Sequence, residues 1–153
     1  MSDAPPEVFA RLQGALQARS DPVRAERAVR AALAAAPDAF EARLAAYKFY
    51  FYNHRLAEAL PHAAFLVGLV ARRLNIAADW RSVAPGEAAF DPRDEAPGLY
   101  LQALIAWGYC AARLGRREEG AEAIAKAAAL DPADRFGARR LLAVVTAGPS
   151  EEE

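Results

Sequence analysis

The sequence predicts an all-α fold in one domain, and three observations support this. Between Phe40 and Leu74 the chain is rich in Ala, Leu, Arg and Glu, with only Pro61 interrupting, a composition that favours helix over such a window. Small and apolar residues recur in the same order about every 34 residues, which is typical of stacked helix pairs. The length of 153 residues suits one hydrophobic core better than two.

The first expected pair of helices covers residues 6–39. Its apolar positions are Phe9, Leu12 and Leu16, followed by Ala25, Val29, Ala32 and finally Pro37. Asp21 followed by Pro22 is typical of a helix start, with an aspartate N-cap and proline in the first turn. The second helix of this pair should therefore begin at residue 22.

The second expected pair covers residues 40–74. Asp38 and Glu41 have the spacing of a capping box, and Asn53 with His54 marks a tight turn between two helices. Ala59 follows Ala25 by one period and should lie where the two helices cross. In the same frame the aromatic residues Tyr47 and Tyr50 should pack between the helices.

An insertion is expected at 75–98, because this stretch is rich in Pro, Gly and Asp. Trp80 and Phe90 within it indicate either docking onto the helical body or a lid that a partner displaces.

The third pair is expected at 101–134, with Gly120 at its helix crossing and Asp131-Pro132 as another helix start. A single capping helix at 135–147 and an acidic tail at 148–153 complete the chain.

This spacing resembles the tetratricopeptide repeat (TPR) family over most of the chain, with three degenerate repeats. The pattern is carried by Leu104, Trp107, Gly108 and Ala111, then Gly120, Ile124, Ala127 and Pro132, and by the matching positions of the first two units. The resemblance implies a right-handed superhelix of antiparallel helix pairs closed by a capping helix. A non-repetitive helical bundle is the alternative, and both are all-α.

In that family the first helix of each repeat lines a concave groove that binds a protein partner. The matching positions that we expect to form a partner-binding groove are Leu44, Lys48, Phe51, Tyr52, Ile105, Tyr109 and Arg113. A clamp for a chain-terminal carboxylate is not expected, since Leu44 and Ile105 occupy places where that subgroup has polar residues. The groove would be apolar and aromatic, with Lys48 and Arg113 as isolated cations. The alternative is that another part of the same chain buries the aromatic residues.

Composition excludes several classes of partner. The 19 Lys plus Arg against 20 Asp plus Glu give a formal net charge of −1, so neither nucleic acid nor an anionic membrane is expected to bind. The N-terminus lacks the features of a secretory signal, and no apolar stretch is long enough for a membrane span. One cysteine, Cys110, excludes an internal disulfide framework. A cytoplasmic protein is expected.

Catalysis is not expected either. His54 and His62 have no third ligand at metal spacing, and Cys110 lies in an apolar helix without an adjacent base. No phosphate-binding glycine loop or nucleophile elbow is present. We therefore expect no cofactor, no metal site and no catalytic residue.

A narrower resemblance concerns bacterial TPR proteins encoded beside nitrogen-fixation genes. It is carried by YNHRLAEA, then Ala78-Asp79-Trp80, then LGRREEGAEAI and LDPADRFGA. It implies an accessory role in nitrogen fixation through protein contacts. The expected function is a non-catalytic scaffold, adaptor or chaperone-like interaction module; the alternative is a structural homodimer that associates through the aromatic face.

Overall fold

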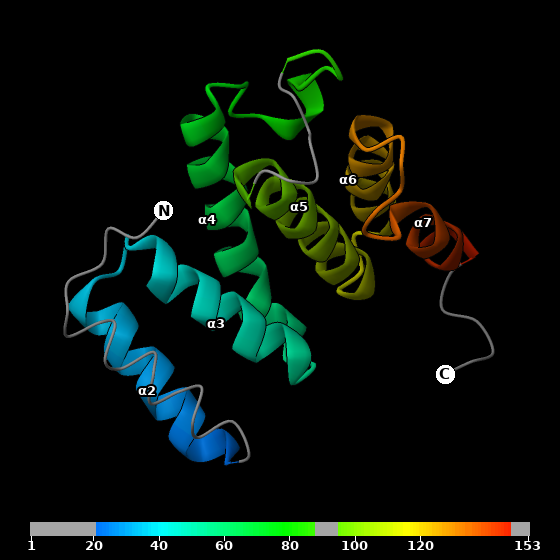
Figure 1. The fold of residues 1–153 in the computed structure, drawn as a ribbon. Coiled ribbons are helices and arrows are strands. Elements are labelled where there is room, and N and C mark those ends of the chain that lie inside the picture. The colour runs from blue at the N-terminus through cyan, green and yellow to red at the C-terminus, as the bar shows by residue number, and fades with distance from the viewer. Residues whose placement is uncertain (1–20, 88–94, 148–153) are drawn as a thin grey trace. The chain divides into compact units, whose positions relative to one another are not determined.

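The computed structural model describes residues 21–87 and 95–147, and these residues are helical with short connections (Figure 1). Within them there is no β-strand, which confirms the predicted all-α class. The expected first helix of the chain, Phe90 and the acidic tail 148–153 lie outside the described residues. The elements are α2 (Pro22–Ala35), α3 (Phe40–Tyr52), α4 (Leu56–Leu74), the 3-10 turn η1 (Trp80–Ser82), α5 (Glu95–Arg113), α6 (Arg117–Leu130) and α7 (Ala138–Ala147).

The chain divides into two compact units, and the single TPR-like domain stays a prediction. Unit 1 is Met1–His62 and unit 2 is Ala63–Glu153, so the boundary falls inside α4.

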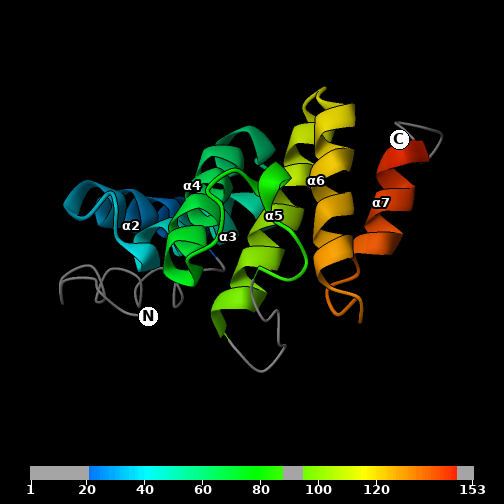
Figure 2. The same cartoon turned by 90° about the horizontal axis from the view of Figure 1, so that it is seen from above.

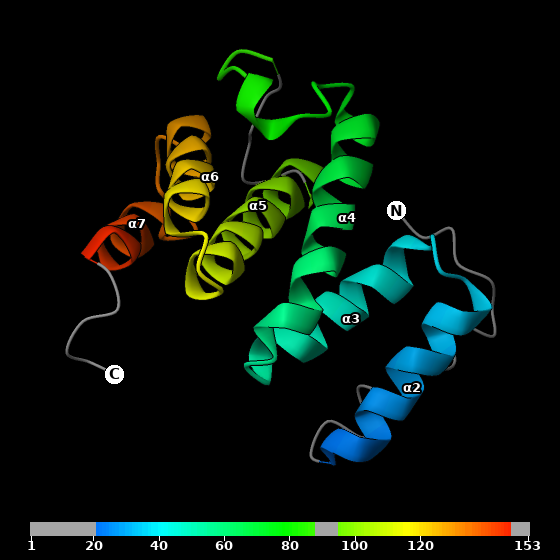
Figure 3. The same ribbon diagram turned by 180° about the vertical axis from the view of Figure 1, so that it is seen from behind.

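In unit 1, α2 begins as the sequence predicted. The Asp21 carboxylate accepts a hydrogen bond from the backbone N–H of Arg24 at 3.3 Å, and Pro22 occupies the first turn. Helices α2 and α3 lie side by side (Figures 1 and 3). The face of α2 that is buried consists of the predicted positions Ala25, Val29 and Ala32.

The predicted capping box at Asp38 and Glu41 is wrong, although the helix begins close to it. Asp38 lies in the turn before α3, so the N-cap position falls to Ala39, which has extended backbone angles and no side-chain cap. The predicted turn after α3 is confirmed. His54 has a left-handed φ of 59°, and α4 starts two residues later.

In unit 2, α6 lies between α5 and α7 (Figure 2). Helix α5 begins at Glu95, within the expected insertion and earlier than the repeat frame placed it. Helices α5 and α6 approach closely at two glycines. A Cβ atom on Gly108 would lie 2.8 Å from the carbonyl oxygen of Gly120, so a side chain is excluded there. Gly120 therefore lies at the helix crossing, as predicted.

The segment after α6 differs from the prediction. Asp131 does not start a helix; it is buried, and its carboxylate accepts a hydrogen bond from the backbone N–H of Arg135 at 2.8 Å. Asp134 and Gly137 have left-handed φ angles of 53° and 73°, which bend the chain before α7. Helix α7 therefore begins at Ala138 and not at residue 135. These helix pairs fit a repeat-like fold, and the TPR superhelix stays a prediction.

Candidate partner-binding site

The seven predicted groove residues lie on two helices. Leu44, Lys48, Phe51 and Tyr52 lie on α3 in unit 1, and Ile105, Tyr109 and Arg113 lie on α5 in unit 2. The single groove that would include both sets stays a prediction.

The four residues on α3 form one helical face, which we call the α3 strip. Residues three, four and seven apart lie on the same side of a helix, so Leu44, Lys48, Phe51 and Tyr52 lie within a sector of about 100°. Tyr52 is 68% exposed, Lys48 is exposed, and Leu44 and Phe51 are half-buried. The Phe51 and Tyr52 rings meet edge to face, with centroids 5.5 Å apart. The strip thus presents an exposed aromatic ring that is supported by a second ring.

The other two tyrosines of the aromatic run are core residues, as predicted. Tyr47 is 6% exposed and Tyr50 is 4% exposed. The Tyr50 ring stacks on the His62 ring at 5.9 Å and contacts Phe49 edge to face. Its hydroxyl donates a hydrogen bond to the Glu26 carboxylate at 2.9 Å. The adjacent aromatic residues of α3 therefore divide between the interior of unit 1 and its surface.

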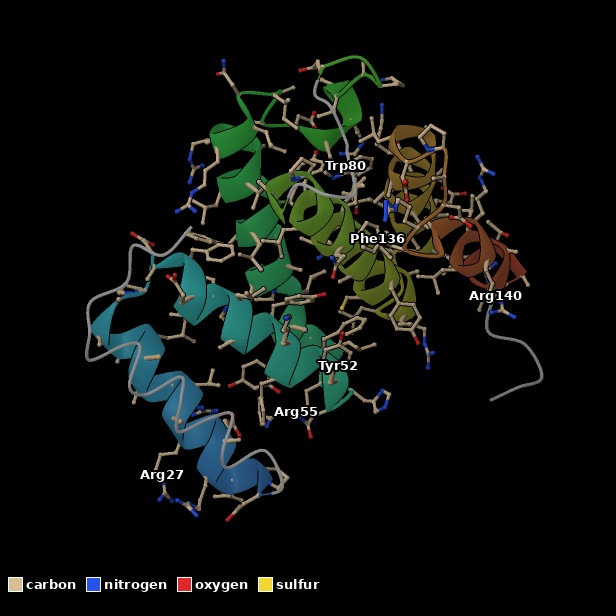
Figure 4. The ribbon with its side chains drawn as sticks, viewed as in Figure 1. Arg27, Tyr52, Arg55, Trp80, Phe136 and Arg140 are labelled. Atoms are coloured by element: carbon tan, nitrogen blue, oxygen red, sulfur yellow. The ribbon has the colours of Figure 1, made fainter. Side chains whose placement is uncertain are left out.

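A charged cluster below the end of α3 was not predicted. Figure 4 shows Arg55 in the turn after α3, on the side of α2. Its guanidinium donates to both oxygens of Glu26, at 2.7 and 3.1 Å, and to both oxygens of Glu58, each at 2.7 Å. It also lies 4.9 Å from the centre of the Tyr50 ring. Arg30, four residues after Glu26 on α2, pairs with the same carboxylate at 2.8 Å. We call Glu26, Arg30, Tyr50, Arg55 and Glu58 the Arg55 cluster. The spacings of Arg55 with Glu58 and of Glu26 with Arg30 could have indicated two of its pairs; no local pattern indicated the pairing of Arg55 with Glu26.

The cluster makes the stability of unit 1 depend on pH. The hydrogen bonds from Arg55 lower the pKa of Glu26 from 4.5 to about 2, against an opposing effect of burial. A folded-state pKa below the unfolded value means that the Glu26 carboxylate stabilises the fold fully above about pH 4.5. This stabilisation is lost as the pH falls through about 2.

Replacing Glu26 with Gln should therefore lower the free energy of unfolding near neutral pH by about 1–3 kcal/mol, because charged hydrogen bonds are lost. The difference from wild type should shrink as the pH is lowered towards 2. Urea unfolding of both proteins at several pH values measures this difference in free energy. Glu118→Gln, which changes an exposed carboxylate on α6, is the control and should change little. If the loss of unfolding free energy in Glu26→Gln stayed constant with pH, the lowered pKa of Glu26 would be contradicted.

The predicted groove residues on α5 differ from expectation in one respect. Arg113 is not an isolated cation: its Nη1 donates a hydrogen bond to the Tyr109 hydroxyl at 2.9 Å, and its guanidinium lies 5.7 Å from the centre of that ring. The two residues are four apart on α5, so the helix places them together. Ile105 is half-buried one turn earlier.

Comparison with known proteins gives one relative. No protein-family model and no solved structure matches the sequence. The "uncharacterized 19.8 kDa protein in nifW 5′ region" of Azotobacter chroococcum mcd 1 is 38% identical over 130 residues, which cover 83% of this chain and 72% of that protein. The chain belongs to the family of this nifW-region protein. The predicted resemblance to a protein encoded beside a nitrogen-fixation gene is confirmed; membership of the TPR family stays a prediction.

In this member of the nifW-region family, the described part of the insertion docks on unit 2. Trp80 is buried, and its ring lies 5.8 Å from that of Trp107 on α5. Arg81 pairs with Glu119 of α6 at 3.1 Å. The Lys126 ammonium donates to the carbonyl oxygen of Val83 at 2.7 Å. The prediction that Trp80 docks on the helical body is therefore confirmed.

The reactive side chains lie apart from the α3 strip. Burial raises the pKa of the Cys110 thiol to about 11, which keeps it protonated near neutral pH. Burial, and then the Arg43 cation, lower the pKa of His62, whose Nδ1 lies 3.3 Å from Arg43 Nη1. His54 is exposed in the turn. In residues 21–87 and 95–147 no group of three potential metal ligands occurs, and no helix there has the length and apolarity needed to cross a bilayer.

Proposed function

We propose that the protein is a non-catalytic interaction module, an adaptor or assembly chaperone accessory to nitrogen fixation. It binds a hydrophobic segment of a partner protein through the α3 strip. The observation that supports this most is the exposure of Tyr52, 68%, beside two tyrosines of the same helix that are almost fully buried.

An exposed tyrosine is suited to protein contacts. Tyrosine is enriched in the buried centres of interfaces, because its ring removes a large apolar area from water while its hydroxyl still finds a hydrogen-bond partner. Tyr52 rests against Phe51, and Phe51 in turn lies 5.8 Å from the buried Tyr47 ring. These ring contacts limit the motion of Tyr52, so less conformational entropy is lost when a partner binds.

The nitrogen-fixation link rests on the relative. That protein is described by its place in the 5′ region of nifW, and this chain matches most of its length. We therefore propose that the partner of this protein acts in nitrogen fixation.

A capture experiment tests this function. Tagged wild-type protein is recovered from a nitrogen-fixing bacterium that carries its gene, grown with and without ammonium, and bound proteins are identified by mass spectrometry. We expect a nitrogen-fixation protein to be captured under fixing conditions and lost with Tyr52→Ala. Val23→Ala is the matched control, since Val23 on α2 is 65% exposed. Equal capture by wild type and Tyr52→Ala would reject the α3 strip as the site.

A further inference from the structure

The α3 strip carries its positive charge at its centre. Lys48 lies four residues after Leu44 and four before Tyr52, which on a helix is about 6 Å along the axis in each direction. Apolar groups therefore lie on both sides of an exposed ammonium. A surface of this kind fits a partner with one acidic group between two apolar ones.

The glutamate carboxylates on the described helices of unit 1 do not pair with Lys48. Glu26 and Glu58 are bound by Arg55. Glu41 lies on the same side of α3, but seven residues before Lys48, or about 10 Å along the axis. In the part of unit 1 that the structure describes, Lys48 makes no ion pair. Its charge is thus available to a partner.

The central position of Lys48 also disfavours a second copy of the chain as the occupant. In a parallel two-fold pair of α3 helices, every residue faces its own copy. In an antiparallel pair centred on the strip, Leu44 faces Tyr52 and Lys48 faces Lys48 of the other copy. Both arrangements bring two ammonium groups together in an apolar contact, which is unfavourable.

We infer, on the basis of the proposed function, that the occupant of the α3 strip is an amphipathic helix with an acidic residue flanked by apolar residues four positions before and after it. The two apolar residues contact Leu44 and the Phe51–Tyr52 pair, and the carboxylate pairs with Lys48. Such a helix lays its apolar face on the strip, as in other helix-in-groove complexes.

Two synthetic peptides test this inference. They are fluorescently labelled helices with the pattern Leu-x3-Glu-x3-Leu and Leu-x3-Lys-x3-Leu, identical elsewhere. Their affinities are measured by fluorescence anisotropy with wild type, Lys48→Glu and Tyr52→Ala, after circular dichroism has shown that each variant is folded. We expect wild type to prefer the glutamate peptide by about five- to tenfold and Lys48→Glu to prefer the lysine peptide. Tyr52→Ala should weaken both.

The outcomes separate the two proposals. If Tyr52→Ala weakens both peptides but Lys48→Glu leaves the preference unchanged, the inferred acidic partner is wrong and the proposed surface stands. If neither peptide binds wild type, or if Tyr52→Ala has no effect, both proposals fail. Sedimentation of wild type over a range of concentrations adds a further test. A dimer that Tyr52→Ala dissociates would show that a second copy occupies the strip and would overturn the inference.

Discussion

Replacing Gly120 with alanine should destabilise unit 2 by about 3 kcal/mol or more, at the upper end of overpacking effects. The added methyl would lie 2.7 Å from the backbone nitrogen of Ala112 and in still closer contact with the carbonyl oxygen of Gly108. Backbone atoms cannot rotate away as a side chain can, so α5 and α6 would have to separate. The measurement is the free energy of unfolding from urea denaturation followed by circular dichroism.

A matched glycine should respond in the opposite direction. Gly68 lies inside α4, and a methyl there would meet only the Arg72 guanidinium, at 3.9 Å. Gly68→Ala should therefore raise the free energy of unfolding by about 0.5–1 kcal/mol, because alanine loses less backbone entropy in a helix. If Gly120→Ala proved as stable as wild type, the close crossing of α5 and α6 would be incorrect.

The second large effect is expected at Tyr50. Tyr50→Ala should cost about 3–5 kcal/mol, as for other large core truncations. It removes the ring between Phe49 and His62 and leaves the Glu26 carboxylate without one of its donors. Tyr50→Phe keeps the ring and should cost about 1 kcal/mol for the lost hydrogen bond.

Tyr52→Ala is the control for Tyr50, since it removes the same side chain two residues further along α3. Because Tyr52 is mostly exposed, its loss should change stability by no more than about 0.5 kcal/mol. If the two alanine variants were destabilised equally, the aromatic residues of α3 would not be divided between the core and the surface. The experiment therefore tests the division of α3 on which the proposed function depends.

The sequence was informative wherever a local pattern determines the structure. The helical composition of 40–74, the turn at Asn53 and His54, and the buried Tyr47 and Tyr50 were all predictable, because helical periodicity assigns residues to faces. The glycine at position 120 was predictable from the repeat spacing. Apart from Gly120, these features need only residues that are near one another in the chain.

Two predicted N-caps, Asp38 and Asp131, were wrong for a local reason. An aspartate before a helix can cap it only if its own backbone is extended at the N-cap position. Asp38 lies in a turn, and Asp131 ends α6 with its carboxylate turned to the backbone of residue 135. Both places have an aspartate before an expected helix, but in neither does the aspartate occupy the N-cap position of that helix.

The contacts between distant segments could not be predicted from one sequence. Arg55 reaches Glu26 across 29 positions, and Lys126 reaches Val83 across 43. Many arginines and lysines were equally available as partners, so only the folded arrangement selects the pair. The pairing of Arg113 with Tyr109 could have been predicted, because the two residues are four apart on one helix. The expectation that Arg113 is an isolated cation was therefore wrong.

We propose that the exposed part of the α3 aromatic run binds a partner, while the buried part maintains the fold. Isothermal titration of a captured partner against wild type and Tyr52→Ala, with the melting temperature of each, tests it most directly. We predict a loss of about 2 kcal/mol in binding free energy, roughly a thirtyfold higher Kd, with an unchanged melting temperature. An unchanged Kd, or a Tyr52→Ala protein that has lost its cooperative unfolding transition, would contradict the claim.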